Sequence, residues 1–250
     1  MTTAAATTLR IPARFHGPPA SGNGGFTAGL VAAATGAPGT VAQTPVQVTL
    51  RLPPPLDTAL SLVPSQEGWV LRDGDRVVAE ASLGPALAPP PPAVSRGEAE
   101  RASASYPGHR GHPFSTCYSC GPDRAEGDGL RIFPGRVGEE AGSGLVAAPW
   151  VTAAEVADPT LVTPVVWAAL DCVGGWSTDL EHRPLVLGRM SAVVHDVLAP
   201  GLLGVVVGEH RGTEGRKTRT ASAWYDEDGR LLGQAEHVWI AVDPAAFGGS

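Results

Sequence analysis

The sequence predicts an α+β protein in two halves, each built from one central helix followed by an antiparallel sheet. An apolar segment with helical character occurs once in each half, at 26–34 and at 165–173. Stretches in which apolar and polar residues alternate follow both segments, and this period is typical of strands. The chain also contains 32 Gly and 24 Pro among its 250 residues. Such a content favours short strands joined by turns over a bundle of helices.

Each predicted helix is bounded by residues with a clear structural preference. Asn23 is placed to cap the first helix, glycines 24–25 open its first turn, and Gly36 follows its end. In the second half, Thr163-Pro164 is expected to supply the N-cap and the first helical residue. The glycine pair 174–175 is expected to stop that helix.

The alternating stretches predict strands after each helix, in an antiparallel meander. Two Asp-Gly pairs, at 73–74 and 228–229, lie between apolar runs and indicate tight hairpins. A sheet of this kind buries its apolar face by wrapping around the helix. The expected strands include 46–52, 59–63, 68–72, 76–83, 185–194, 204–209, 217–225 and 231–242.

A break in composition divides the chain. Four consecutive prolines at 89–92 favour an extended segment, and the polar stretch 95–110 shows no apolar period. The sequence therefore predicts an N-terminal half at 1–86, a Pro-rich linker at 87–111 and a C-terminal half at 112–250.

Composition and charge argue against several classes of function. The net charge is −7 and no block of Lys or Arg occurs, so we expect no nucleic-acid partner. The apolar stretches are shorter than the ~20 residues of a membrane span, and the first ten residues lack the pattern of a signal peptide. Three cysteines are an odd, sparse set for a secreted disulfide framework. We therefore expect a cytoplasmic protein.

Four stretches of sequence together suggest a known family. Residues 115–123 read Ser-Thr-Cys-Tyr-Ser-Cys-Gly-Pro-Asp, and 129–133 read Gly-Leu-Arg-Ile-Phe. The closing stretch 214–236 contains Glu-Gly-Arg-Lys, Tyr-Asp-Glu-Asp-Gly-Arg-Leu-Leu and Gln-Ala-Glu. These stretches resemble the opening and the last hairpin of hotdog thioesterases of the phenylacetate-pathway type. The turn at 23–25 resembles the His-Gly-Gly turn of that family, with Asn in place of His.

The resemblance implies a tandem, or double, hotdog protein of the thioesterase superfamily. In this fold two antiparallel sheets each wrap around a central helix, and the two halves form one pseudo-twofold unit. In the family, the amide of the turn's first glycine polarises the thioester carbonyl. An acidic residue nine positions after the motif's histidine acts from the partner domain as base or nucleophile. A helix N-terminus suits this role, because it presents free N–H groups to a developing oxyanion.

Counting those nine positions in this chain gives two unequal halves. Ala32 stands nine residues after Asn23, so the first half has the turn and lacks the acid. Asp171 supplies an acid in the second half, where Thr163-Pro164 replaces the glycine pair and proline has no N–H. The resemblance therefore implies one complete composite site and one inactive site per chain. The residues of the complete site are Asn23, Gly24, Gly25 and Asp171.

Both parts of this site also have a structural interpretation. Asn-Gly-Gly is a common turn and helix cap. Asp171 lies toward the C-terminal end of an apolar helix, where the helix dipole disfavours negative charge, and an Arg or a backbone amide could be its partner. Burying an unpaired carboxylate is costly, which favours a functional role for Asp171.

Histidines and cysteines cluster near the start of the second half. His109, His112, Cys117 and Cys120 fall within twelve residues, and Cys-x-x-Cys is a spacing that structural zinc sites use. A second such pair is missing from the sequence, and His109 lies in the linker. A zinc site, a redox pair and an ordered loop with free thiols all stay open. We adopt the last and predict no metal, and we expect Cys172 in the core.

Three cations near the end of the chain could contact coenzyme A. Arg216, Lys217 and Arg219 lie in or beside one predicted strand, where the matching family segment often binds phosphates. Charged residues also protect a strand edge from aggregation, so this segment has a structural interpretation too. No cofactor is expected beyond the coenzyme A of the substrate.

The leading hypothesis is hydrolysis of an acyl thioester, an acyl-CoA, with Asp171 as base or nucleophile and Gly24 as oxyanion donor. The alternatives are a hotdog protein that binds acyl-CoA or a small ligand without catalysis, and a zinc-dependent interaction module. Hydration is disfavoured, because hotdog hydratases need an Asp with a His five positions later and this chain has none. We expect the protein to form a homodimer and to bind a small acyl thioester. We expect no contact with a membrane.

Overall fold

The computed structural model describes residues 6–36, 44–138 and 144–243. Within these ranges, eleven strands form one sheet in the order β1-β3-β4-β5-β2-β8-β11-β10-β9-β7-β6, and every recorded pairing is antiparallel. The strands are β1 Thr7–Leu9, β2 Val46–Leu50, β3 Leu60–Ser65, β4 Gly68–Asp73, β5 Arg76–Leu83, β6 Gly135–Arg136, β7 Leu145–Val151, β8 Leu185–Val194, β9 Leu203–Glu214, β10 Lys217–Tyr225 and β11 Leu231–Ala241. The α-helices are α1 Gly24–Ala34, α2 Arg96–Ser103 and α3 Val162–Trp176, and short 3-10 helices lie at Ala13–Phe15, Pro107–His109 and Ala154–Ala157.

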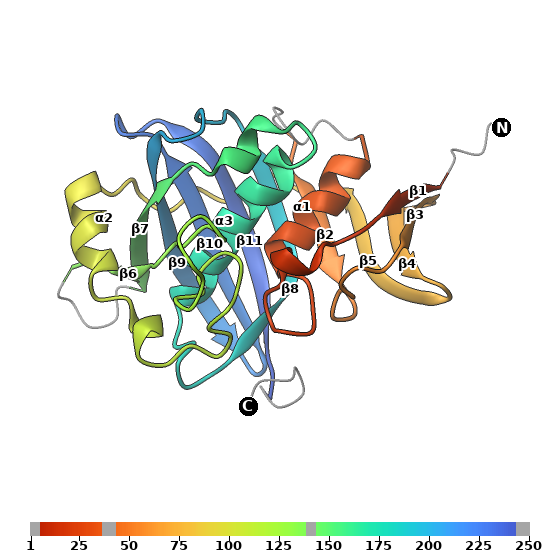
Figure 1. Ribbon diagram of the computed structural model, residues 1–250, viewed down its shortest axis with the longest axis horizontal. Coiled ribbons are helices and arrows are strands. Elements are labelled where there is room, and N and C mark those ends of the chain that lie inside the picture. The colour runs from red at the N-terminus through yellow and green to blue at the C-terminus, as the bar shows by residue number, and fades with distance from the viewer. Residues whose placement is uncertain (1–5, 37–43, 139–143, 244–250) are drawn as a thin grey trace.

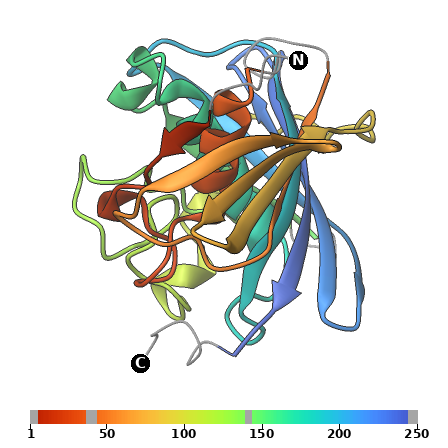
Figure 2. The ribbon, with the colours of Figure 1, turned by 90° about the vertical axis from the view of Figure 1, so that its right-hand side faces the viewer.

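The expectation of two sheets, each wrapped around its own helix, is wrong. The two halves share one continuous sheet, because β2 of the first half pairs with β8 of the second, with Val48 opposite Met190. Both long helices lie on the same side of this curved sheet (Figures 1 and 2). One large core cluster includes buried residues of both helices and of strands from both halves. The α+β class and the antiparallel meanders are confirmed.

Helices α1 and α3 pack directly on each other. A Cβ on Gly25 would lie 2.4 Å from the Cβ of Asp171, and a Cβ on Gly29 would lie 2.6 Å from the Cα of Pro164. The first turn of α1 therefore contacts the C-terminal half of α3, and the next turn contacts its N-terminal end, so the helices are antiparallel. Glycine at both positions permits this close approach. The contact holds the N-terminus of α1 against Asp171.

The sequence predicts the start of α1 correctly and both ends of α3 incorrectly. Asn23 caps α1 as expected, since its side chain accepts a hydrogen bond from the Phe26 amide. In contrast, α3 begins at Val162, so Thr163 lies inside the helix and does not cap it, and the helix continues through glycines 174–175 to Trp176. A Cβ on Gly174 would lie 2.7 Å from Nδ1 of His237. These glycines therefore let the helix lie close to the sheet and do not stop it.

All eight strands expected from the alternating pattern are present, with end shifts of a few residues and a longer β9 that extends to Glu214. Three strands, β1, β6 and β7, were not expected. Among the described residues, no helix combines the length and the apolar character that a membrane span requires.

The predicted linker is more ordered than its composition indicates. Residues 84–94 contain no regular secondary structure, but α2 follows directly. Ser95 and Glu98 form a capping box at its start, and Ala99 and Ala102 are buried on its inner face. The linker therefore contains a helix that the missing apolar period at 95–110 did not predict. Two alanines suffice to dock this short helix, and so small an apolar face gives only a weak periodic signal.

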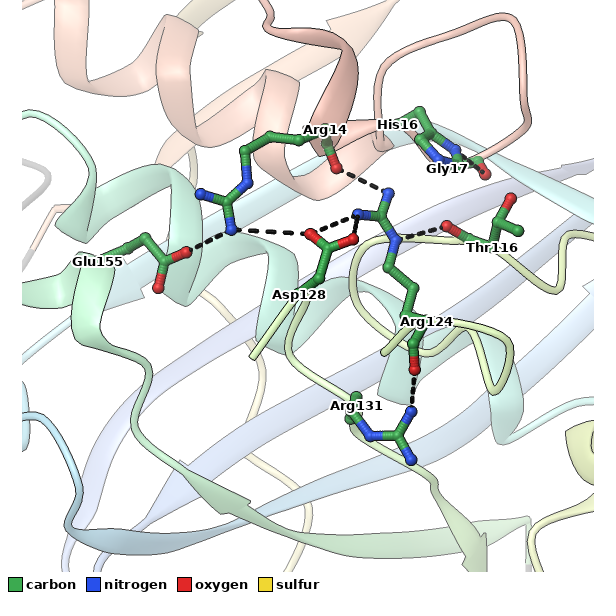
Figure 3. Close-up of polar contacts among 8 residues, drawn as sticks. All are labelled: Arg14, His16, Gly17, Thr116, Arg124, Asp128, Arg131 and Glu155. Carbon is green, nitrogen blue, oxygen red and sulfur yellow. Dashed lines mark hydrogen bonds and ion pairs between the residues drawn. The ribbon is translucent and has the colours of Figure 1, made fainter. Parts of the chain in front are cut away.

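One buried arginine fastens the loop that precedes β6 to the rest of the fold (Figure 3). The Arg124 side chain is 5% exposed. Its Nε donates to the Thr116 carbonyl at 2.8 Å and its Nη2 to the Arg14 carbonyl at 2.7 Å. Its Nη1 contacts the Asp128 carboxylate at 3.0 Å, and Arg14 in turn pairs with Glu155 at 2.9 Å. This loop also carries Cys117 and Cys120, so Arg124 positions them.

We predict that Arg124→Met lowers the free energy of unfolding by about 2–3 kcal/mol, because the hydrogen bonds of a buried guanidinium to two backbone carbonyls and its ion pair with Asp128 are lost. Urea denaturation measures the loss. The control is Arg230→Met, whose exposed pairs with Asp196 and Asp226 should contribute at most about 1 kcal/mol. Equal losses in the two variants would contradict the anchoring role.

We predict that His237 destabilises the fold as the pH falls. Its side chain is buried, and burial lowers its pKa to about 3. An unfolded histidine has a pKa of about 6.5, so the unfolded state binds the proton first. The contribution of neutral His237 to the free energy of unfolding is fully present above about pH 6.5. It decreases by up to about 1.4 kcal/mol per pH unit as the pH falls toward 3. Urea unfolding at about pH 7.5 and about pH 5 measures this loss. If a His237→Gln variant loses as much free energy of unfolding as the wild type between these two pH values, the effect does not come from His237.

Candidate functional site

A cavity of about 260 Å³ lies where the two halves meet. Its wall combines the loop before α1, the loop after β2, residues 112–120, the C-terminal half of α3, and the ends of β8 and β11. The volume is near the lower limit of ordinary ligand pockets, which measure roughly 300–1,000 Å³. The apolar part of the wall includes Leu50, Leu52, Pro54, Phe114, Trp176, Leu180, Leu187, Trp239 and Ile240.

The N-terminus of α1 opens into this cavity. Asn23 and Gly24 both line it. Among the described residues, no acceptor is recorded for the Gly24 amide, whose N–H is one of the free donors at a helix start. A Cβ on Gly24 would lie 2.7 Å from the Cβ of Leu187, so β8 runs directly beside this turn. A residue with a free backbone donor, at the partly positive end of a helix, therefore lines the cavity.

Asp171, on α3, also lines the cavity beside the N-terminus of α1. Its Oδ2 accepts a hydrogen bond from the Gly25 amide at 2.7 Å, and the residue is 2% exposed. Its Oδ1 is buried and has no hydrogen-bond partner among the described residues. Burial raises the pKa of this carboxyl to about 8, although the Gly25 amide works in the opposite direction. Such a group near neutral pH can both accept and donate a proton.

The structure brings together all four residues expected in the composite site, and their hydrogen bonds differ. The Gly25 amide is already engaged by Asp171, which leaves Gly24 as the free amide of this turn. Both ends of the Asn23 amide also contact protein. Its Oδ1 accepts from the Phe26 amide at 2.8 Å, and its Nδ2 lies 3.5 Å from the Ser119 hydroxyl.

The opposite end of the helix pair lacks these groups. Leu161 is the N-cap of α3 and makes no side-chain hydrogen bond to it, and Pro164 occupies the first turn. Ala32, the counterpart of Asp171 in the nine-residue count, is buried and has no acid–base chemistry. The asymmetry read from the sequence therefore corresponds to an asymmetry of the two helix N-termini.

Three cysteines converge beside Asp171. The sulfur atoms of Cys117, Cys120 and Cys172 lie within 4.8 Å of one another, and all three residues are buried and line the cavity. Hydrogen bonds from its two neighbours lower the pKa of the Cys117 thiol, and His112 adds to this effect. Cys172 was expected only as a core residue. Its position next to Asp171 on one helix is the signal that could have placed it at the site. His109 does not line the cavity.

The cations predicted to bind coenzyme A lie elsewhere. Arg216, Lys217 and Arg219 are exposed at the β9–β10 hairpin and do not line the cavity. The guanidinium of Arg216 donates to the Ala241 carbonyl. Arg51, which the sequence did not single out, lines the cavity and pairs with Glu80. A role for the three predicted cations in phosphate binding stays a prediction.

Comparison with known proteins identifies the fold and no sequence family. No protein-family model and no curated protein matches the chain. Among solved structures, a protein of unknown function with a hotdog fold from Alicyclobacillus acidocaldarius matches with a TM-score of 0.59 and 13% identity, covering 96% of each chain. An acyl-CoA thioesterase II from Mycobacterium marinum matches with a TM-score of 0.61 and 10% identity, covering 98% of this chain and 96% of that one. A bifunctional dehydratase-cyclase domain in ambruticin biosynthesis matches with a TM-score of 0.53 and 16% identity, covering 98% and 97%.

At these identities the matches establish the architecture and leave the reaction open, because a thioesterase and a dehydratase-cyclase domain both share it. Their coverage extends over both halves of the chain. The chain therefore has a hotdog fold that extends over both of its halves, as the motifs at 23–25 and 115–133 implied.

Proposed function

We propose that this protein hydrolyses an acyl thioester, an acyl-CoA, at one composite site between its two halves. The observation that carries the proposal is the meeting of a free helix-N-terminal amide, Gly24, with a buried carboxyl, Asp171, in one apolar cavity. Neither half contains both groups. The thioesterases among the structural matches support hydrolysis, although their low identity leaves the substrate to be tested.

The two groups have complementary tasks in acyl transfer. The Gly24 N–H would donate to the thioester oxygen as negative charge develops on it, aided by the dipole of α1. In its ionised form, the Oδ1 of Asp171, which has no partner among the described residues, would attack the acyl carbon or remove a proton from the attacking water. The C–S bond then breaks and the thiolate of the carrier leaves. The Gly25 amide fixes the other oxygen, so the carboxyl has one orientation. Asn23 positions the turn through its cap.

The wall fits the apolar part of such a substrate. Aliphatic and aromatic side chains from both halves face the cavity, and its volume suits a short acyl group better than a long one.

We predict that Asp171→Asn abolishes turnover and keeps the fold. Asparagine has the same shape and can still accept from the Gly25 amide, but it provides neither base nor nucleophile. The loss should be at least about 100-fold in kcat, as for other general bases. The melting temperature should change little, because burial already keeps the Asp171 carboxyl largely protonated near neutral pH and asparagine has the same shape. Free thiol released from short, medium, long and aromatic acyl-CoAs measures the activity. Full activity in this variant would refute the assignment of Asp171.

We predict that removing the Gly24 N–H costs about 100-fold or more in kcat. Proline is tolerated at the first position of a helix, and Asn23 before it already has an extended ψ of 133°. A Cβ here would lie 2.7 Å from the Cβ of Leu187, so the test uses a Leu187→Gly background, which removes that atom. The two variants compared are Gly24→Pro and Gly24→Ala, since both add a Cβ and only the first removes the donor. Equal kcat values in the pair would show that this amide does not act in the reaction.

Binding without catalysis is the second candidate. Two observations favour it. The Gly25 amide already donates to Asp171 and is not free for a substrate, and the Asp171 carboxyl is buried. A thermal-shift titration with the same acyl-CoAs separates the two, because a ligand raises the melting temperature with its concentration. A concentration-dependent rise without thiol release would favour the binding protein over the hydrolase.

A further inference from the structure

The three cysteines of the cavity form a cluster that hydrolysis does not use. Cys117 and Cys120 come from the loop at 110–134, and Cys172 comes from α3. The sulfur atoms of Cys117 and Cys172 are 3.8 Å apart, and all three lie within 4.8 Å of one another. Two sulfur ligands of a tetrahedral zinc ion, with Zn–S near 2.3 Å, are about 3.8 Å apart. The cluster therefore has the dimensions of a zinc-thiolate site.

The loop is shaped to bring its two cysteines together. The Gly121 amide donates to the Cys117 carbonyl at 2.9 Å and closes a tight turn over the Cys-x-x-Cys segment. A Cβ on Gly121 would lie 2.6 Å from the amide nitrogen of Cys117 and from its carbonyl oxygen. Only glycine therefore fits the turn as it stands. Free thiols alone do not require this arrangement.

Nitrogen donors surround the sulfur atoms. The Asn23 Nδ2 lies 3.6 Å from the sulfur of Cys117 and 3.8 Å from that of Cys172. The Phe114 amide donates to Nδ1 of His112 at 2.8 Å, which leaves the ring proton on Nε2. This Nε2 is 3.3 Å from the sulfur of Cys120 and donates to it. Donors of this kind stabilise thiolates that ligate a metal.

We propose that Cys117, Cys120 and Cys172 bind one Zn²⁺ through their thiolates, with the fourth coordination position open to the cavity. Zn²⁺ suits a soft, tetrahedral set of sulfur ligands, and sites with three protein ligands keep the fourth for water or a small ligand. All three cysteines line the cavity, so that position faces the space beside Asp171. His112 and Asn23 act as hydrogen-bond donors to the sulfurs and not as ligands. The bound ion would join the loop to α3.

The first test is a titration of reduced, metal-free protein with Co²⁺, whose tetrahedral thiolate complexes give charge-transfer bands and strong visible bands. We expect saturation at one ion per chain and displacement of the bands by Zn²⁺. Cys117→Ser, Cys120→Ser and Cys172→Ser should each remove or strongly weaken the bands. The control Ser115→Ala, a change in the same loop away from the sulfurs, should keep them. Retention of the full spectrum in any of the cysteine variants would overturn the ligand set.

The second test uses the wild-type chain, so it does not depend on the folding of the variants. One equivalent of Zn²⁺ should slow the reaction of the three thiols with a maleimide at least tenfold, and a chelator should restore the rate. Equal rates with and without Zn²⁺ would overturn the proposal. A stable disulfide between two of the cysteines in protein purified with zinc present, seen as a mass loss of two hydrogens, would also overturn it. Neither test depends on thioester hydrolysis, so the two proposals can fail separately.

Discussion

The close antiparallel contact between α1 and α3 determines the rest of the site. Gly25 and Gly29 allow the helix backbones to approach, and any side chain at Gly25 would meet the Cβ of Asp171 or the carbonyl of Trp167. The contact places the positive end of α1 next to the one acidic residue of α3. The hydrogen bond from the Gly25 amide to Asp171 links the two halves directly. The same contact brings Asn23 to the cysteines, so the cavity depends on it throughout.

The continuous sheet explains why the two halves act as one unit. Pairing of β2 with β8 joins the two meanders edge to edge, and the helices lie together on one side of the joined sheet (Figure 2). A cavity between the halves then receives residues from both, with Gly24 from the first and Asp171 from the second. A single half would leave an unpaired strand edge and an exposed helix face, both of which are unfavourable.

The sequence predicts local features of this protein well and long-range contacts less well. The Asn23 cap and the Asp-Gly hairpins follow from short-range preferences, and the structure has them. The β2–β8 pairing depends on residues more than 130 positions apart, and no local pattern encodes it. The glycine pair 174–175 was predicted to stop the helix, and only the position of His237 on the sheet shows that Gly174 serves a close contact. For the site, the resemblance to hotdog thioesterases, with the spacing it implies, selected Asp171. The convergence of Cys172 with Cys117 and Cys120 required the fold.

A crystal structure with a non-hydrolysable acyl-CoA analogue, in which the thioester sulfur is replaced by a methylene group, tests the composite site most directly. The account predicts that the carbonyl oxygen of the analogue lies about 3 Å from the Gly24 amide. It also predicts that the carbonyl carbon faces Oδ1 of Asp171. A carbonyl group bound in the cavity away from both residues, or an analogue bound elsewhere on the chain, would contradict it.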